Sequence, residues 1–165
     1  MCGIAGVYSP DPNEASIAPM VECLTHRGPD DGGMHRDGPV QLGIRRLAVI
    51  DLVTGDQPMT NRDGSIVVVY NGEIFNYKEL TAELSAKGYV FKSKSDTEVL
   101  AHGFQEWGED LVDHLNGQFA FAIWNGKRLF IARDRMGEKP LYYVHEDGRL
   151  IFASEIKAIL TRYES

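Results

Sequence analysis

Short apolar runs bounded by turn residues recur along the chain and predict β-strands. Gly3–Tyr8 is the first of these runs, and it begins next to the N-terminus. Three dipeptides with Gly in second place lie between extended stretches, and Gly accepts the positive φ that tight hairpin turns need. These dipeptides are Asp37-Gly38, Asn125-Gly126 and Asp147-Gly148. We therefore expect sheets that are largely antiparallel.

Helical spacing of apolar residues predicts a first helix over residues 13–25. Its apolar face would hold Ile17, Met20, Val21 and Leu24. The Gly, Pro and Asp content of residues 26–33 predicts a loop directly after this helix.

Two further helices follow the same spacing. One carries Tyr77, Leu80 and Leu84, and the other carries Leu100, Phe104 and Trp107. Asn76 is the expected N-cap of the earlier helix. Ser95 and Glu98 form a capping box before the later one, in which each side chain would bind a backbone N–H of the first turn.

Residues 66–70 and 119–124 are apolar at nearly every position. A strand with one face in water would alternate apolar and polar residues, so these two strands are expected to be covered on both faces. Two packed antiparallel sheets with helices outside them would provide that cover. The pattern predicts a layered α+β fold, and 165 residues suit one domain, residues 1–165.

Composition excludes several classes of protein. A net charge of −7 argues against nucleic acid as a partner, because phosphate binding requires clustered Lys and Arg. Two cysteines are too few for a secreted disulfide scaffold. No apolar run reaches the roughly 18 residues of a membrane span, and no signal sequence opens the chain. We expect a cytoplasmic protein that does not bind membranes.

The first candidate for chemistry is Cys2. Removal of Met1 would leave a free α-amine beside the thiol of this residue. The amine has a pKa of about 7.7–8.0, so part of it is neutral at pH 7 and able to accept the thiol proton. Nucleophile and base would then belong to one residue. The alternative is that a Cys in second position has no role.

The segment Asn71-Gly72 ends an apolar strand and has the composition of an oxyanion hole, since an amide side chain and the next N–H can face one oxygen. The same dipeptide is common in simple turns. Arg46 could fork onto a carboxylate and Asp96 could accept from an ammonium group. Taken alone, Arg46 is typical of a surface ion pair and Asp96 of a favourable charge at a helix start.

The histidines do not predict a metal site. His26, His35, His102, His114 and His145 lack metal-ligand spacing with one another and with Cys23. Cys23 falls on the apolar side of the first predicted helix, where we expect it to be buried and unreactive.

Seven motifs in order resemble the glutaminase domain of class II glutamine amidotransferases, most closely that of the glutamine-hydrolysing asparagine synthetase type. The resemblance spans essentially the whole chain. The motifs begin at Met1, His26, Arg46, Asn71, Ser95, Asp134 and Ser154, and read MCGI, HRGPD, RLAVID, NGEI, SDTE, DRMGEKPLYY and SEIKA.

This resemblance implies a four-layer α-β-β-α sandwich of the N-terminal nucleophile hydrolases. It implies that Cys2 is the nucleophile and that Asn71 and the Gly72 amide form the oxyanion hole. It also implies a binding site for the substrate, glutamine. Arg46 would bind its α-carboxylate, Asp96 its α-amine, and the site would be completed by Val49, Ile50 and Glu73.

The chain departs from asparagine synthetases in one respect, because no pyrophosphate loop follows the last motif. We therefore expect that the ATP-using synthetase domain is absent, that ATP and magnesium belong only to that domain, and that this domain needs no cofactor. Its partner would be an ammonia-accepting synthetase domain or subunit, and a homodimer is compatible with the resemblance. Two alternatives stay open: the glutaminase domain of an aminosugar or purine-precursor synthase, and a catalytically silent module with the same fold.

Overall fold

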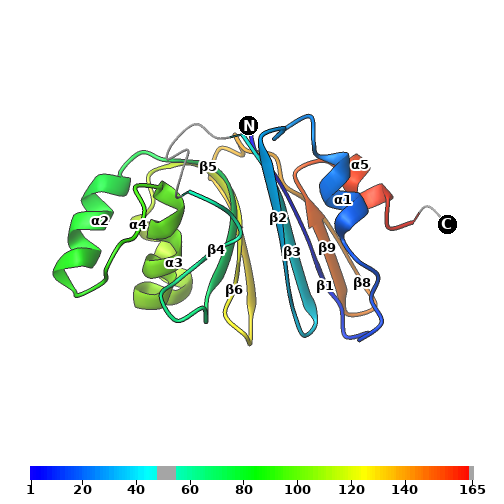
Figure 1. Ribbon diagram of the computed structural model, residues 1–165, viewed down its shortest axis with the longest axis horizontal. Coiled ribbons are helices and arrows are strands. Elements are labelled where there is room, and N and C mark those ends of the chain that lie inside the picture. The colour runs from blue at the N-terminus through cyan, green and yellow to red at the C-terminus, as the bar shows by residue number, and fades with distance from the viewer. Residues whose placement is uncertain (48–54, 164–165) are drawn as a thin grey trace.

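The computed structural model describes residues 1–47 and 55–163, which form two β-sheets packed face to face between helices (Figure 1). We call them sheet 1, with the order β2-β3-β1-β9-β8, and sheet 2, with the order β4-β5-β6-β7. In chain order the elements are β1 (Gly3–Tyr8), α1 (Ala18–Cys23), β2 (Asp31–Asp37), β3 (Val40–Arg46), β4 (Met59–Thr60), β5 (Val67–Ile74), α2 (Tyr77–Ala86), α3 (Asp96–Trp107), the 3₁₀ turn η1 (Gly108–Asp110), α4 (Leu111–His114), β6 (Gly117–Trp124), β7 (Leu129–Arg133), β8 (Tyr142–Glu146), β9 (Arg149–Ala153) and α5 (Ile156–Leu160).

The layers follow the predicted order. Helices α1 and α5 cover the outer face of sheet 1. On the outer face of sheet 2 lies α3, and α2 and α4 pack against α3 (Figure 1). Every strand pairing among the described residues is antiparallel. The α+β sandwich of two antiparallel sheets expected from the sequence is therefore confirmed.

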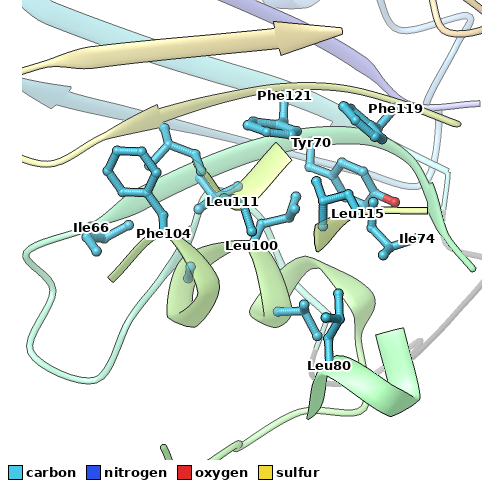
Figure 2. Close-up of a cluster of buried hydrophobic side chains, with 14 of the residues drawn as sticks. Ile66, Tyr70, Ile74, Leu80, Leu100, Phe104, Leu111, Leu115, Phe119 and Phe121 are labelled. Carbon is cyan, nitrogen blue, oxygen red and sulfur yellow. The ribbon is translucent and has the colours of Figure 1, made fainter. Parts of the chain in front are cut away.

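The apolar faces of β5 explain why residues 66–70 are hydrophobic throughout. Val67 and Val69 point into the core between the two sheets. Val68 and Tyr70 point the other way, into the core under α3, which Figure 2 shows. A third cluster packs α1 and α5 onto sheet 1. Both faces of β5 are thus removed from water, as the pattern predicted.

The three predicted hairpins are all present, and each turn uses the conformational freedom of Gly. Their Gly residues have positive φ angles of 51° at Gly38, 81° at Gly126 and 75° at Gly148. Sheet 1 is thereby folded from β2–β3 and β8–β9 hairpins, with β1 between them.

The first helix is shorter than predicted, because α1 spans only Ala18–Cys23 rather than residues 13–25. Pro19 lies in its first turn and has no N–H to donate to the preceding turn. The side chain of Gln41 then satisfies the backbone before the helix: it accepts from Ile17 N at 3.2 Å and donates to the Ala15 carbonyl at 3.0 Å. These contacts come from β3 and replace helical hydrogen bonds.

The loop predicted over residues 26–33 is too long, because β2 already begins at Asp31. Gly33 lies in this strand, where it pairs with Ile44 of β3, and a Cβ there would lie 2.3 Å from the carbonyl oxygen of Gln57. Glycine therefore serves close backbone approach at this position rather than a turn.

Of the side-chain caps predicted for α2 and α3, only the one from Ser95 is present. Ser95 caps α3 by accepting from Thr97 N at 3.2 Å, but Glu98 accepts instead from the backbone N–H groups of Lys92 and Ser93. Asn76 occupies the N-cap position of α2 without a side-chain cap. Its amide donates to the His114 carbonyl at 2.9 Å, so it ties the start of α2 to the end of α4.

Among the described residues, no helix combines the length and the apolar composition of a membrane span.

Candidate active site

A cavity of about 210 Å³ lies where the first residues of the chain meet the ends of β3 and β5 and the start of α3. Both sheets contribute to its wall. The lining residues are Met1, Cys2, Arg46, Leu47, Gly55, Gln57, Tyr70, Asn71, Gly72, Glu73, Ser95, Asp96, Thr97 and Lys139. The cavity therefore brings together six of the eight residues singled out in the sequence.

Cys2 is half-buried and is held in place by two hydrogen bonds. Its thiol donates to the Leu47 carbonyl, with 3.7 Å between sulfur and oxygen, and its own carbonyl accepts from Arg27 Nε at 2.9 Å. Met1 also lines the cavity, and its sulfur accepts from Lys139 Nζ at 3.6 Å. While Met1 is attached, the nitrogen of Cys2 is part of a peptide bond and has no lone pair for a proton.

Asn71 supplies a polar group without a partner. Its Nδ2 is buried and makes no hydrogen bond with any described residue. Gly72 follows it on the cavity wall. A Cβ at Gly72 would lie 2.2 Å from the Gln118 carbonyl oxygen, so only Gly lets β5 and β6 approach this closely. The two donors proposed for an oxyanion hole therefore face the cavity that contains the Cys2 thiol.

Arg46 is the last residue of β3, and only 7% of its side chain is exposed. Its Nη1 lies 3.0 Å from Asp56 Oδ1, while the carboxylate of Asp56 is largely in solvent. Arg46 thus forms an ion pair with a surface carboxylate, as the alternative interpretation had it, but its own guanidinium is enclosed at the cavity wall. A buried guanidinium beside an open space is suited to a second, bound carboxylate.

Asp96 is the first residue of α3 and is almost fully buried. Its Oδ2 accepts from the Tyr70 hydroxyl at 2.6 Å and from Ile74 N at 2.9 Å. Burial raises the pKa of this carboxyl, and the hydrogen bonds from Tyr70 and Ile74 oppose that rise. Asp96 is therefore more than a helix-start charge, since it is bonded into β5 and faces the cavity.

The remaining predicted residues have less definite places. Glu73 is exposed and lies on the cavity wall near the end of β5. Val49 and Ile50 lie outside the described residues.

Cys23 is half-buried rather than buried, because it ends α1 at the edge of the cluster between that helix and sheet 1. The described residues contain no group of three or more His, Cys, Asp or Glu placed to hold a metal ion.

Several lining residues were missed in the sequence, namely Gln57, Tyr70, Thr97 and Lys139. Gln57 links two of them, because it accepts from Tyr70 N at 2.7 Å and donates to the Thr97 hydroxyl at 3.4 Å. Tyr70 directly precedes the Asn71 motif, but the apolar pattern of its strand indicated only a core residue. Lys139 lies within the motif that begins at Asp134, but the motif did not single it out, and Gln57 carries no local signal that separates it from surface residues.

The fold and the site define a class of protein. The family model of the glutamine amidotransferase domain matches residues 1–165, and the chain belongs to that family. It is 46% identical to the glutamine-hydrolysing asparagine synthetases 3 and 2 of Bacillus subtilis, over 97% and 98% of its length, and 43% identical to asparagine synthetase 2 of rice over 96%. The chain spans only 22–28% of the length of these relatives.

Solved structures share the sandwich. The glutamine phosphoribosylpyrophosphate amidotransferase of B. subtilis, complexed with ADP and GMP, superposes with a TM-score of 0.80 over 98% of this chain and 44% of its own, at 24% identity. A structure described as the allosteric regulatory enzyme of purine biosynthesis gives a TM-score of 0.82 over 98% of this chain and 43% of its own, at 23% identity. The predicted sandwich fold is thus shared with solved structures, and the sequence relatives reported above are glutamine-hydrolysing asparagine synthetases.

Proposed function

We propose that this domain hydrolyses glutamine to glutamate and ammonia with the thiol of Cys2 as nucleophile. The observation that carries the proposal is a single cavity lined by this thiol, directly before β1 of sheet 1, and by Asn71 of sheet 2, whose buried Nδ2 has no partner among the described residues. A thiol can attack the amide carbon of glutamine, and an unpaired buried donor can bind the oxyanion that the attack creates.

The chemistry follows from these groups once Met1 is removed. The Cys2 amine takes the thiol proton, and sulfur forms a bond to the amide carbon of glutamine. The carbonyl oxygen becomes an oxyanion held by Asn71 Nδ2 and the Gly72 N–H. The amine returns its proton to the nitrogen of the substrate, the carbon–nitrogen bond breaks, and ammonia leaves. Water then attacks the thioester, and glutamate and the free thiol are restored.

Recognition of glutamine is assigned first to two of the charged groups on the cavity wall, Arg46 and Asp96. The enclosed guanidinium of Arg46 is proposed to bind the α-carboxylate and the Asp96 carboxylate the α-ammonium group. Glu73, Val49 and Ile50 are proposed to complete the site, as the resemblance implied. None of these groups requires a cofactor for the hydrolytic step.

The use of the ammonia is proposed from the relatives. They are named glutamine-hydrolysing asparagine synthetases, and this chain matches about a quarter of each. We propose that ammonia passes to a synthetase domain or subunit that uses ATP and magnesium. A cytoplasmic location and a homodimeric assembly stay predictions.

The test combines intact mass with turnover. Active protein should lack the mass of one methionine and should release ammonia from glutamine. Cys2→Ala and Cys2→Ser should each lose nearly all turnover, while circular dichroism stays unchanged. Full activity from homogeneous protein that retains Met1 would contradict the mechanism. Absence of turnover from protein that begins at Cys2 would instead identify a silent module.

A further inference from the structure

Tyr70 connects the core of the molecule to the cavity. Its ring lies in the apolar cluster under α3, beside Ile74 and Leu115 (Figure 2). Its hydroxyl reaches the carboxylate of Asp96 at 2.6 Å, and the residue as a whole is only 2% exposed. The ring is fixed by packing, so the hydroxyl is held at one place relative to the first turn of α3.

The direction of this hydrogen bond is set by the environment. Burial, followed by the neighbouring Asp96, raises the pKa of Tyr70 well above its usual range, so the hydroxyl keeps its proton and donates it. Both hydrogen bonds that Asp96 receives from Tyr70 and Ile74 end on Oδ2. The two bonds restrain rotation of the Asp96 side chain, which lines the cavity.

Other charges around Asp96 do not replace this contact. Glu73 on β5 opposes ionisation of Asp96 by like-charge repulsion. Cys2, Arg46, Lys139 and the terminal amine share the same cavity. Arg46 contacts Asp56, and Lys139 contacts Met1. From α2, Lys78 lines a separate depression with Ser95.

We propose that Tyr70 is a positioning residue that holds the Asp96 carboxylate charged and aimed at the α-ammonium group of glutamine. The inference rests on the proposed function. Tyr70 would then help to determine specificity for substrates with an α-amino group, and it would do so by positioning Asp96.

The contribution of Tyr70 should appear in KM and not in kcat. The α-ammonium group does not react, so its contacts are similar in the ground state and the transition state, and their loss raises KM. Loss of a hydrogen bond to a charged group should raise the KM for glutamine roughly tenfold near pH 7. It should also let Asp96 take up a proton at higher pH, which moves the acid limb of kcat/KM upward by about one pH unit.

The experiment uses Tyr70→Phe, which removes one oxygen and keeps the ring. Glutamine is compared with glutaric acid monoamide, which is glutamine without its α-amino group. We expect KM to rise for glutamine and to change little for the monoamide, with kcat nearly constant for both. Tyr89→Phe is the matched control, because the Tyr89 hydroxyl also meets a carboxylate, Glu106 at 3.0 Å, but far from the cavity lining.

Both KM values are measured on the same folded molecules, so partial unfolding does not alter their ratio. If Tyr70→Phe does not fold, Tyr70→Met provides a flexible apolar replacement for the same comparison. An equal rise for both substrates, or no rise and no shift of the acid limb, overturns the role of Tyr70. If wild-type protein that begins at Cys2 releases no ammonia from glutamine, the proposed function has failed instead.

Discussion

A buried nitrogen without a hydrogen-bond partner is costly, and Nδ2 of Asn71 is such an atom within the described residues. Leaving a polar group buried and unsatisfied costs about 1–3 kcal/mol. A substrate oxygen that enters the cavity can accept a hydrogen bond from Nδ2 and so remove this destabilisation. The hydrogen bond is strongest when the oxygen carries a negative charge. Asn71 is therefore better matched to an oxyanion than to the resting site.

We predict that Asn71→Ala lowers kcat by about 10²–10³ and changes KM much less. The reason is that the hydrogen bond to the carbonyl oxygen strengthens as charge develops on it. Steady-state kinetics of ammonia release provide the measurement. A large rise in KM at constant kcat would assign Asn71 to ground-state binding of glutamine.

Individual site residues could be predicted from the sequence where their immediate neighbours in the chain pointed to their role. Cys2 could be identified because it directly follows Met1, and Asn71 because Gly72 supplies the neighbouring N–H of an oxyanion hole. The bond between Tyr70 and Asp96 could not, because the two residues are 26 positions apart and meet only when α3 packs on β5.

At the scale of elements, the turn after β7 is organised by one carboxylate. Asp134 accepts from Phe119 N at 3.1 Å, Glu138 N at 2.9 Å and Lys139 N at 3.1 Å. Arg133 closes the same turn by donating to the Lys139 carbonyl at 2.6 Å. These bonds place Lys139 at the cavity although the turn has no regular secondary structure.

We predict that Asp134→Ala lowers the free energy of unfolding by roughly 2–4 kcal/mol, because one buried and two partly buried N–H groups lose their acceptor together. Urea denaturation measures the change. Asp113→Ala is the control, since its carboxylate is 74% exposed in a surface pair with Arg135. Equal stability of Asp134→Ala and Asp113→Ala would show that the turn is held by other contacts.

Elements were predictable from sequence where neighbouring residues determine them. The three hairpins needed only a glycine between extended stretches. The start of α1 and the length of β2 were not predictable, because both depend on β3, which lies further along the chain. Gln41 of β3 bonds the backbone before α1, and Arg46 of β3 pairs with Asp31.

At the scale of the whole molecule, Glu155 joins segments from both ends of the chain. It contacts His26 at 2.8 Å and Arg27 at 3.1 Å, and Arg27 in turn holds the carbonyl of Cys2. Burial alone would raise the pKa of Glu155. The hydrogen bonds from His26, Arg27 and Lys157 outweigh that effect and lower the pKa from 4.5 to about 2.

The sign of the resulting pH dependence is determined by this lowered pKa. The stabilisation is fully present above the unfolded value of 4.5 and is lost as pH falls through about 2. We predict that Glu155→Gln lowers the melting temperature at pH 6 and that the difference from wild type shrinks steadily below pH 4.5. Glu109→Gln serves as control, because its pair with Arg128 is exposed on both sides. A difference that stays constant down to pH 2 would contradict the prediction.

The sandwich itself was predictable, because two strands apolar on both faces require cover on both faces. The location of the site was not. Cys2 belongs to the start of sheet 1 and Asn71 to the end of β5 in sheet 2, and only the packing of the two sheets shows that these ends coincide.

The two sheets are also joined at the opposite end, where Trp124 Nε1 donates to Asp37 Oδ2 at 2.7 Å. The start of β1 lies roughly 17 Å away along the strand Gly3–Tyr8, so this bond and the cavity lie at opposite ends of the sandwich. A glutamine bound by groups from both sheets, as proposed, would add a second polar link between the sheets, at the end that the bond between Trp124 and Asp37 does not reach.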